Sequence, residues 1–168
     1  MESIQRQTVL IDLLAGQHPN GKPVLEKVRA LAEPGAESGK DAYCLLQSPL
    51  FVTGAACGDI IDMLQNNPGR FRVRERSGQL AVRVFCRDGV TQLENELTPA
   101  VEMLDGQLDV QSERALVYSI HVAVGFHEIE QVFDAHVGTL ENATWSYGNV
   151  YDPETGAPLE WWEDLLNP

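Results

Sequence analysis

The side chains that could do chemistry are few, and their spacing matches no familiar metal-binding pattern. His121, His127 and His136 could offer imidazole nitrogens to a metal ion, but His127-Glu128 is not followed by a histidine at the spacing that helical zinc sites need. His136 is better interpreted as a half-buried helical residue near a helix C-terminus, where a positive charge is favoured. We therefore expect no metal and no other cofactor.

Candidate nucleophiles also lack partners. Cys57 is followed by Gly-Asp, which supplies no base to activate a thiol. Ser119 and His121 would point the same way on a strand, but side chains about 7 Å apart make a poor nucleophile–base pair. The run Gly54–Asp59 lacks the Gly-Lys-Ser/Thr ending of a phosphate loop, so it predicts a turn in which Asp59 bonds local backbone. An enzyme stays only an alternative.

Charge is sorted along the chain. Residues 90–168 contain one basic residue, Arg114, and fifteen acidic residues, whereas residues 1–89 contain eleven basic and ten acidic residues. The second half thus has a formal charge of −14 and the first half +1, which together make the −13 of the whole chain. An acidic half repels phosphate groups and attracts cationic surfaces. The pattern predicts a basic protein partner and argues against nucleic acid.

Length and composition bound the class of protein. The chain has 168 residues, 43% of them hydrophobic, which suffices for one core or two small ones. The N-terminus has no signal-peptide pattern, and no apolar run approaches the roughly 20 residues of a membrane helix. Cys44, Cys57 and Cys86 are interpreted as buried, reduced thiols. We expect a cytoplasmic protein that does not contact membranes.

The first half of the chain is predicted to be strands and turns. The apolar patterns predict strands at residues 7–14, 42–46 and 59–64, and residues 24–31 fit a strand or a short helix. Ser77-Gly78 predicts a two-residue hairpin turn within residues 70–87. That hairpin would bury Phe71, Val73, Leu80, Val82, Val84 and Cys86 on one face and leave Arg70, Arg72, Arg74, Arg76, Arg83 and Arg87 on the other. We interpret the arginine face as solvated, with phosphate or an acidic partner as the alternative.

After Gln79 the spacing of the apolar residues changes, and helical spacing appears between the strands. Helical spacing predicts helices at about Thr91–Leu104 and Phe126–Val137, and alternation predicts strands near Leu108–Val110, at 115–124 and at 144–150. Residues 159–166 predict a short terminal helix. The fold class is therefore α+β: a small N-terminal β-barrel-like part over residues 1–78, then a ferredoxin-like βαββαβ sandwich over residues 79–168.

Several short motifs lie in the first half of the chain, namely Ala42–Val52, Gly54–Ile61, Gly69-Arg70-Phe71, Ser77-Gly78, Val82-Arg83-Val84 and Asp88-Gly89. Together they resemble a bacterial family of unknown function, DUF4265. The resemblance covers roughly residues 24–150 and rests mostly on glycines and apolar residues. It implies a fold and a bacterial origin, and it carries over no catalytic residue.

These observations favour a non-enzymatic binding module whose acidic half engages a basic protein, such as an immunity or antitoxin protein that neutralises a cationic nuclease-type toxin. The adjacent Trp161 and Trp162 are interpreted as packing on the sheet, with a protein interface as the alternative. The predicted partner-binding residues are Glu128, Glu130, Glu160, Trp161, Trp162, Glu163 and Asp164. A homodimer is a further alternative for the assembly of the chain. The alternative function is a small-ligand-binding domain with a pocket between the barrel and the sandwich.

Overall fold

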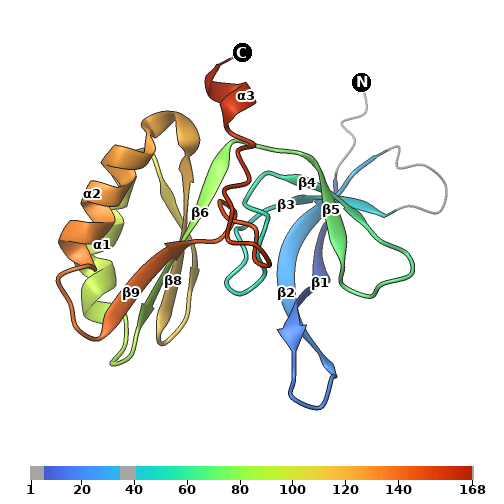
Figure 1. Cartoon of the computed structure of the whole chain (residues 1–168), viewed down its shortest axis with the longest axis horizontal. Coiled ribbons are helices and arrows are strands. Elements are labelled where there is room, and N and C mark those ends of the chain that lie inside the picture. Colours follow the sequence, from blue (N-terminus) through green and yellow to red (C-terminus); the bar gives the residue numbers. More distant parts are fainter. Residues whose placement is uncertain (1–5, 35–40, 168) are drawn as a thin grey trace.

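Two antiparallel sheets form the frame of the computed structural model, which describes residues 6–34 and 41–167 (Figure 1). The first sheet has its strands in chain order: β1 (Thr8–Gln17), β2 (Pro23–Ala32), β3 (Ala42–Leu45), β4 (Ile60–Met63) and β5 (Phe71–Glu75). The second sheet has the order β7 (Gln107–Gln111), β8 (Ala115–His121), β6 (Gln79–Cys86) and β9 (Ala143–Tyr147). The protein is therefore a mixed α+β protein, as predicted.

The first sheet is an open meander. β1 and β2 form a long hairpin around the turn at His18–Lys22, and the strand interpretation of residues 24–31 is confirmed. Its core is made by Leu13, Val28, Leu45 and Ile61, all almost fully buried. Among the described residues β1 and β5 share no ladder, although the Leu14 amide donates to the Gly69 carbonyl at 2.8 Å. The sheet does not close into a barrel.

Two helices cover one face of the second sheet, α1 (Thr91–Glu102) and α2 (Phe126–His136) (Figure 1). Leu93, Leu97 and Val101 of α1 recur at helical spacing and are buried against the sheet, as are Ile129 and Phe133 of α2. The four-stranded antiparallel sheet and both helices that the sequence predicted are confirmed.

The hairpin predicted at Ser77-Gly78 is wrong. β5 pairs with β4 in the first sheet, and β6 pairs with β8 and β9 in the second. Residues 76–78 therefore carry the chain from one sheet to the other. The predicted burial of Val82 and Val84 is confirmed, whereas Phe71 and Val73 are only half-buried and Arg83 is buried rather than exposed.

The other differences are at element ends. The strand predicted to reach Val124 ends at His121, because Val122–Val124 form a 3-10 turn in which the His121 imidazole accepts the Ala123 amide. The predicted terminal helix is only α3 (Glu163–Leu166), because Glu160 has a positive φ of 61° that a right-handed helix does not accommodate. No helix in the described ranges is long and apolar enough to cross a membrane.

Candidate functional site

The segment between β3 and β4 joins the two sheets. Residues 46–59 leave the first sheet and lie on the face of the second sheet that the helices do not cover, where Phe51 stacks on Phe85 of β6. β8 is consequently covered on both faces, and residues 115–120 are all buried. This explains why a central strand of an antiparallel sheet carries an almost continuous run of apolar and hydroxyl residues.

Glu26 and Arg83 hold this segment from opposite sides. The Glu26 carboxylate on β2 accepts the amides of Leu50, Phe51 and Val52 at 2.6, 2.8 and 2.9 Å. The Arg83 guanidinium on β6 donates to the carbonyls of Phe51 and Val52. Burial lowers the pKa of Arg83, and the Glu26 charge opposes that shift. The two charges polarise the same peptide groups and link the two sheets through them.

Buried hydroxyl groups form a second link. Ser48 and Ser119 share a hydrogen bond of 2.7 Å, and the Ser119 hydroxyl donates to the Asp109 carboxylate. The Ser48 amide donates to the same carboxylate at 2.7 Å, while the Ser48 hydroxyl accepts the Cys57 amide at 2.9 Å. These bonds place serine beside an acid, but they satisfy buried polar groups and supply no imidazole base to the hydroxyls.

Cys57 is a poor nucleophile in this setting. Its half-buried thiol receives the Gln107 side-chain amide at 3.7 Å. Burial, and then the Asp109 carboxylate, raises the pKa of the Cys57 thiol to about 12. At neutral pH the sulfur therefore keeps its proton, and thiolate chemistry is suppressed.

The glycine-rich run before β4 is a structural turn. Asp59, only 1% exposed, accepts the Ala56 amide at 3.0 Å and the Ser77 amide at 2.9 Å. Its carboxylate also lies 3.6 Å from the Arg76 guanidinium. Burial raises the pKa of Asp59, while these hydrogen bonds and Arg76 oppose the shift. The predicted local backbone bonding of Asp59 is confirmed, and the run leads into strand β4.

The predicted arginine face does not exist as one surface. Arg72 and Arg74 contact Asp62 on the neighbouring strand β4. Arg76 donates to the Gly54 carbonyl at 2.7 Å and lies over the Trp161 ring, and Arg83 is buried between the sheets. The reason is the crossing at residues 76–78, which separates the arginines of β5 from those of β6.

The two tryptophans are packing residues at the start of α2. The Trp161 indole donates to the Asn149 carbonyl at 2.8 Å, and its ring meets that of Trp162 edge to face. Trp162 contacts Phe126, the first residue of α2, with ring centroids 5.1 Å apart. Both indoles are half-buried, and Trp162 docks the C-terminal segment on the first residue of α2.

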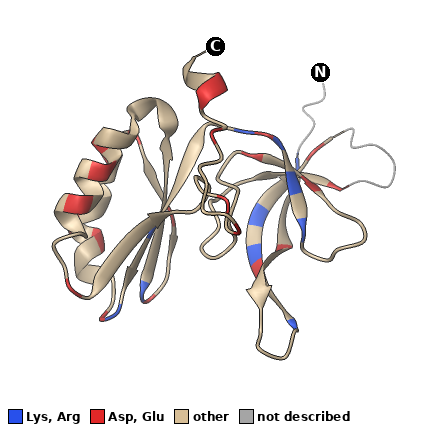
Figure 2. Ribbon diagram, viewed as in Figure 1, with Lys and Arg blue, Asp and Glu red and all other residues tan. Residues whose placement is uncertain are grey.

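The acids of the second half lie mostly on the helical layer and in the C-terminal segment (Figure 2). Glu128, Glu160, Glu163 and Asp164 are exposed, and Glu130 is half-exposed. Among the described residues every ion pair uses an acid of the first half, and no acid after Val90 has a cationic partner. Ion pairs within the part of the chain that the structure describes therefore do not neutralise this charge.

The histidines do not converge. His121 ends β8, whereas His127 and His136 lie near opposite ends of α2, with His136 bonded to the Val132 carbonyl at 2.8 Å. In the described part of the chain no three histidine, cysteine or acidic side chains form a metal-binding group.

Reasoning from the sequence did not find the residues that join the sheets, namely Glu26, Ser48, Arg83, Asp109 and Ser119. The sequence does contain one signal for this role of Arg83. The arginine lies between Val82 and Val84 in a strand that is otherwise almost entirely apolar. A lone arginine between two buried valines must itself find buried acceptors if the strand is central and covered on both faces.

One comparison identifies the family, and another finds a similar fold. The family model described as a domain of unknown function (DUF4265) matches residues 30–144. The fold is similar to the crystal structure of a hypothetical protein from Neisseria gonorrhoeae, with a TM-score of 0.61 and 12% identity, over 88% of this chain and 96% of that chain. No curated protein matches the chain.

Proposed function

The chain belongs to the DUF4265 family of domains of unknown function, and we propose that it is a non-enzymatic binding module whose acidic second half engages a basic protein. The observation that carries the proposal is the absence of cationic partners for the acids after Val90 among the described residues. Carboxylates left unpaired on one side of a molecule attract a cationic surface and steer its approach.

The binding end we propose is the start of α2 together with the C-terminal segment. Trp162 packs on Phe126, so the C-terminal segment that leads into Glu163 and Asp164 of α3 contacts the start of α2, the helix that carries Glu128 and Glu130. Half-buried indoles beside exposed carboxylates offer apolar contact inside a charged rim, the composition of many protein interfaces. The proposed contact residues are Glu128, Glu130, Glu160, Trp161, Trp162, Glu163 and Asp164.

The finer assignments are proposals of the same kind. The most concrete version of the function is a bacterial cytoplasmic immunity or antitoxin protein whose target is a cationic nuclease-type toxin. For the fold we propose a ferredoxin-like sandwich over residues 79–168, which the strand order β7-β8-β6-β9 supports. We also propose a partly open, barrel-like first domain over residues 1–78, which the Leu14–Gly69 hydrogen bond supports.

The test is an affinity capture from bacterial lysate at low and high salt, with a gel-shift assay against DNA and RNA alongside. We expect basic proteins to be captured at low salt and released at high salt, because exposed charges are screened over about 8–10 Å at physiological ionic strength. Binding to nucleic acid with no protein captured would overturn the proposal and shift attention to the arginines of β5.

A further inference from the structure

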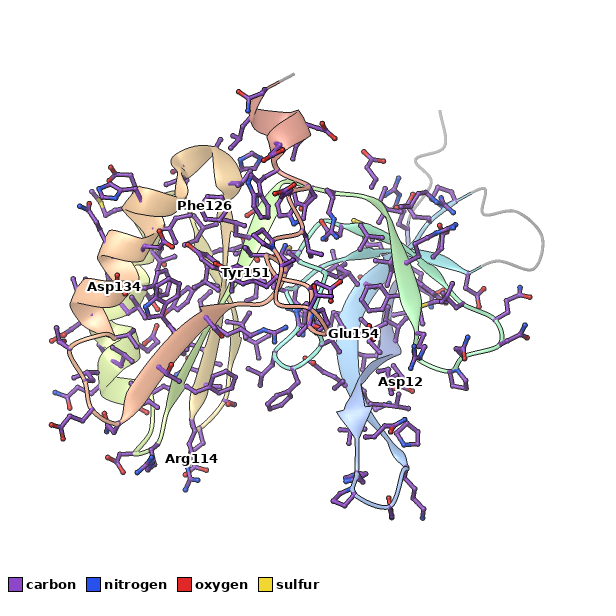
Figure 3. The ribbon with its side chains drawn as sticks, viewed as in Figure 1. Asp12, Arg114, Phe126, Asp134, Tyr151 and Glu154 are labelled. Carbon is purple, nitrogen blue, oxygen red and sulfur yellow. The ribbon has the colours of Figure 1, made fainter. Side chains whose placement is uncertain are left out.

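A cavity of about 500 Å³ lies where the first sheet meets the C-terminal segment. Its walls come from the end of β1, the segment after β3, the start of β5 and the turn after β9, which in Figure 3 hangs between the two sheets near the labelled Glu154. Its volume falls within the range of about 300–1,000 Å³ typical of small-molecule sites. The proposed protein-binding function does not use this cavity.

The cavity has an apolar wall. Leu14 of β1, Phe71 and Val73 of β5, and Leu159 of the C-terminal segment line it, and none of the four is fully buried. Apolar side chains that a fold leaves partly uncovered in a concave place gain free energy when an apolar ligand covers them.

Two arginines line the cavity, Arg70 and Arg76, and within the described chain only Arg70 leaves its positive charge unbalanced. Arg76 is held in place by the Gly54 carbonyl, Asp59 and the Trp161 ring, so Asp59 balances its charge. Arg70 is exposed and makes no ion pair with any residue that the structure describes. The nearby Asp152 carboxylate accepts the amides of Glu154 and Thr155 and is occupied within its own turn.

The backbone leaves space at two positions. A Cβ atom built on Gly16 or on Gly54, both of which line the cavity, would meet no other atom within 4 Å. The Thr53 side chain is exposed at the same edge. No described side chain therefore crowds these two backbone positions of the cavity lining.

We propose that this cavity binds a small organic anion with an apolar body, which packs on Phe71 and Leu159 and pairs its anionic group with Arg70. The ligand is anionic because Arg70, a cation in the lining of the cavity, has no ion-pair partner in the described chain. The apolar body is selected because most of the wall is aliphatic or aromatic.

The test uses a pair of dyes with almost the same aromatic body, 1-anilinonaphthalene-8-sulfonate and the uncharged N-phenyl-1-naphthylamine. We expect the full-length protein to bind the sulfonate with one-to-one stoichiometry and about three- to tenfold more tightly than the uncharged dye, the range of a partly exposed charge pair. Arg70→Gln should reduce sulfonate affinity to that of the uncharged dye. The matched control Arg114→Gln, an exposed arginine between β7 and β8, should change neither affinity.

Two further experiments locate the binding site and identify the anionic group of the ligand. Thr53→Trp should block both dyes, and amide chemical-shift changes in the wild-type protein should centre on Ala15, Gly54 and Val73, which covers the case in which the tryptophan variant does not fold. Decanoate or decyl phosphate should displace the sulfonate, and their ranking separates carboxylate from phosphate ligands. Equal affinity for the two dyes, displacement by decanol as strong as by decanoate, or shifts centred elsewhere would overturn the proposal.

Discussion

At the residue scale, Arg83 shows how one side chain ties the two sheets together. It leaves the middle of β6 on the face away from the helices and donates to the same peptide segment that Glu26 holds from β2. Arg83 is only 6% exposed, and its guanidinium is tolerated there because two carbonyl oxygens accept hydrogen bonds from its terminal nitrogens and the Glu26 carboxylate favours its charge.

Removing this side chain should loosen the contact between the sheets. We expect Arg83→Ala to lower the free energy of unfolding by about 2–4 kcal/mol, because it leaves two carbonyls without their donor and opens a cavity. Arg87→Ala, at an exposed position just after the same strand, should cost less than about 0.5 kcal/mol. Urea titration of both variants checks this, and equal midpoints would show that Arg83 does not support the fold.

Cys57 predicts a pH dependence of stability. Its thiol pKa rises from 9.0 to about 12 in the folded state, so the unfolded chain releases this proton first as pH rises. The stabilising contribution is therefore complete below pH 9 and is lost as pH approaches 12. We expect Cys57→Ser to lose less stability than the wild type between pH 9 and 11 in chemical denaturation. Identical pH profiles would contradict the raised pKa.

Alkylation by iodoacetamide gives an independent measurement on the same residue. At pH 8 the native Cys57 thiol should react at least about tenfold more slowly than in denaturant, because its thiolate fraction is much smaller. Mass spectrometry of the modified peptide resolves Cys57 from Cys44 and Cys86. Fast native labelling at Cys57 would mean that the thiol is not protected as the structure indicates.

At the element scale, most elements follow from local patterns in the sequence. The 3.6-residue spacing of Leu93, Leu97 and Val101 identifies α1, and alternation identifies β6 and β8. The pairing of β5 with β4 does not follow, because Ser77-Gly78 between two alternating segments has the same local signature whether the strands pair or cross between sheets. Sheet membership is set by long-range contacts such as Ser77 with Asp59.

The dependence on long-range contacts also explains which parts of the candidate site could not be predicted from the sequence. Acidic residues, tryptophans and their order are visible in the sequence, whereas the docking of Trp162 on Phe126 depends on the path of the chain after β9. The cavity beside Arg70 combines segments separated by more than a hundred residues, and no local pattern brings Leu14 and Leu159 together.

The face of β6 that packs against the helices leads to a further prediction. Val82 is fully buried against the helices, whereas Thr144 on the paired strand β9 is exposed. Val82→Asp should cost about 3–5 kcal/mol, because it buries an unpaired carboxylate, and Thr144→Asp should cost less than about 1 kcal/mol. Thermal melts of both variants measure the difference. A Val82→Asp protein that melts like the wild type would refute the orientation of β6.

At the scale of the whole molecule, charge and architecture divide the chain in the same way. Lysines and arginines lie largely on the first sheet, on β2 and β5, while the acids of residues 90–168 lie mostly on the helices and the C-terminal segment (Figure 2). Each half of the molecule thus presents a different electrostatic surface, and the acidic half is the one without internal ion pairs in the described chain.

The central claim is that the end formed by α2 and α3 contacts a basic protein, and two charge-reversed variants test it most directly. One variant changes Glu128, Glu130, Glu163 and Asp164 to lysine, and the other changes Glu96, Glu102, Asp105 and Glu141, so each moves the formal net charge from −13 to −5. The measurement is the association rate constant with the captured basic partner by stopped flow at several salt concentrations. We expect the first variant to associate at least about tenfold more slowly than the second, with a larger effect on association than on dissociation. Equal rates for the two variants would show that net charge alone is responsible, and would contradict a binding site at this end.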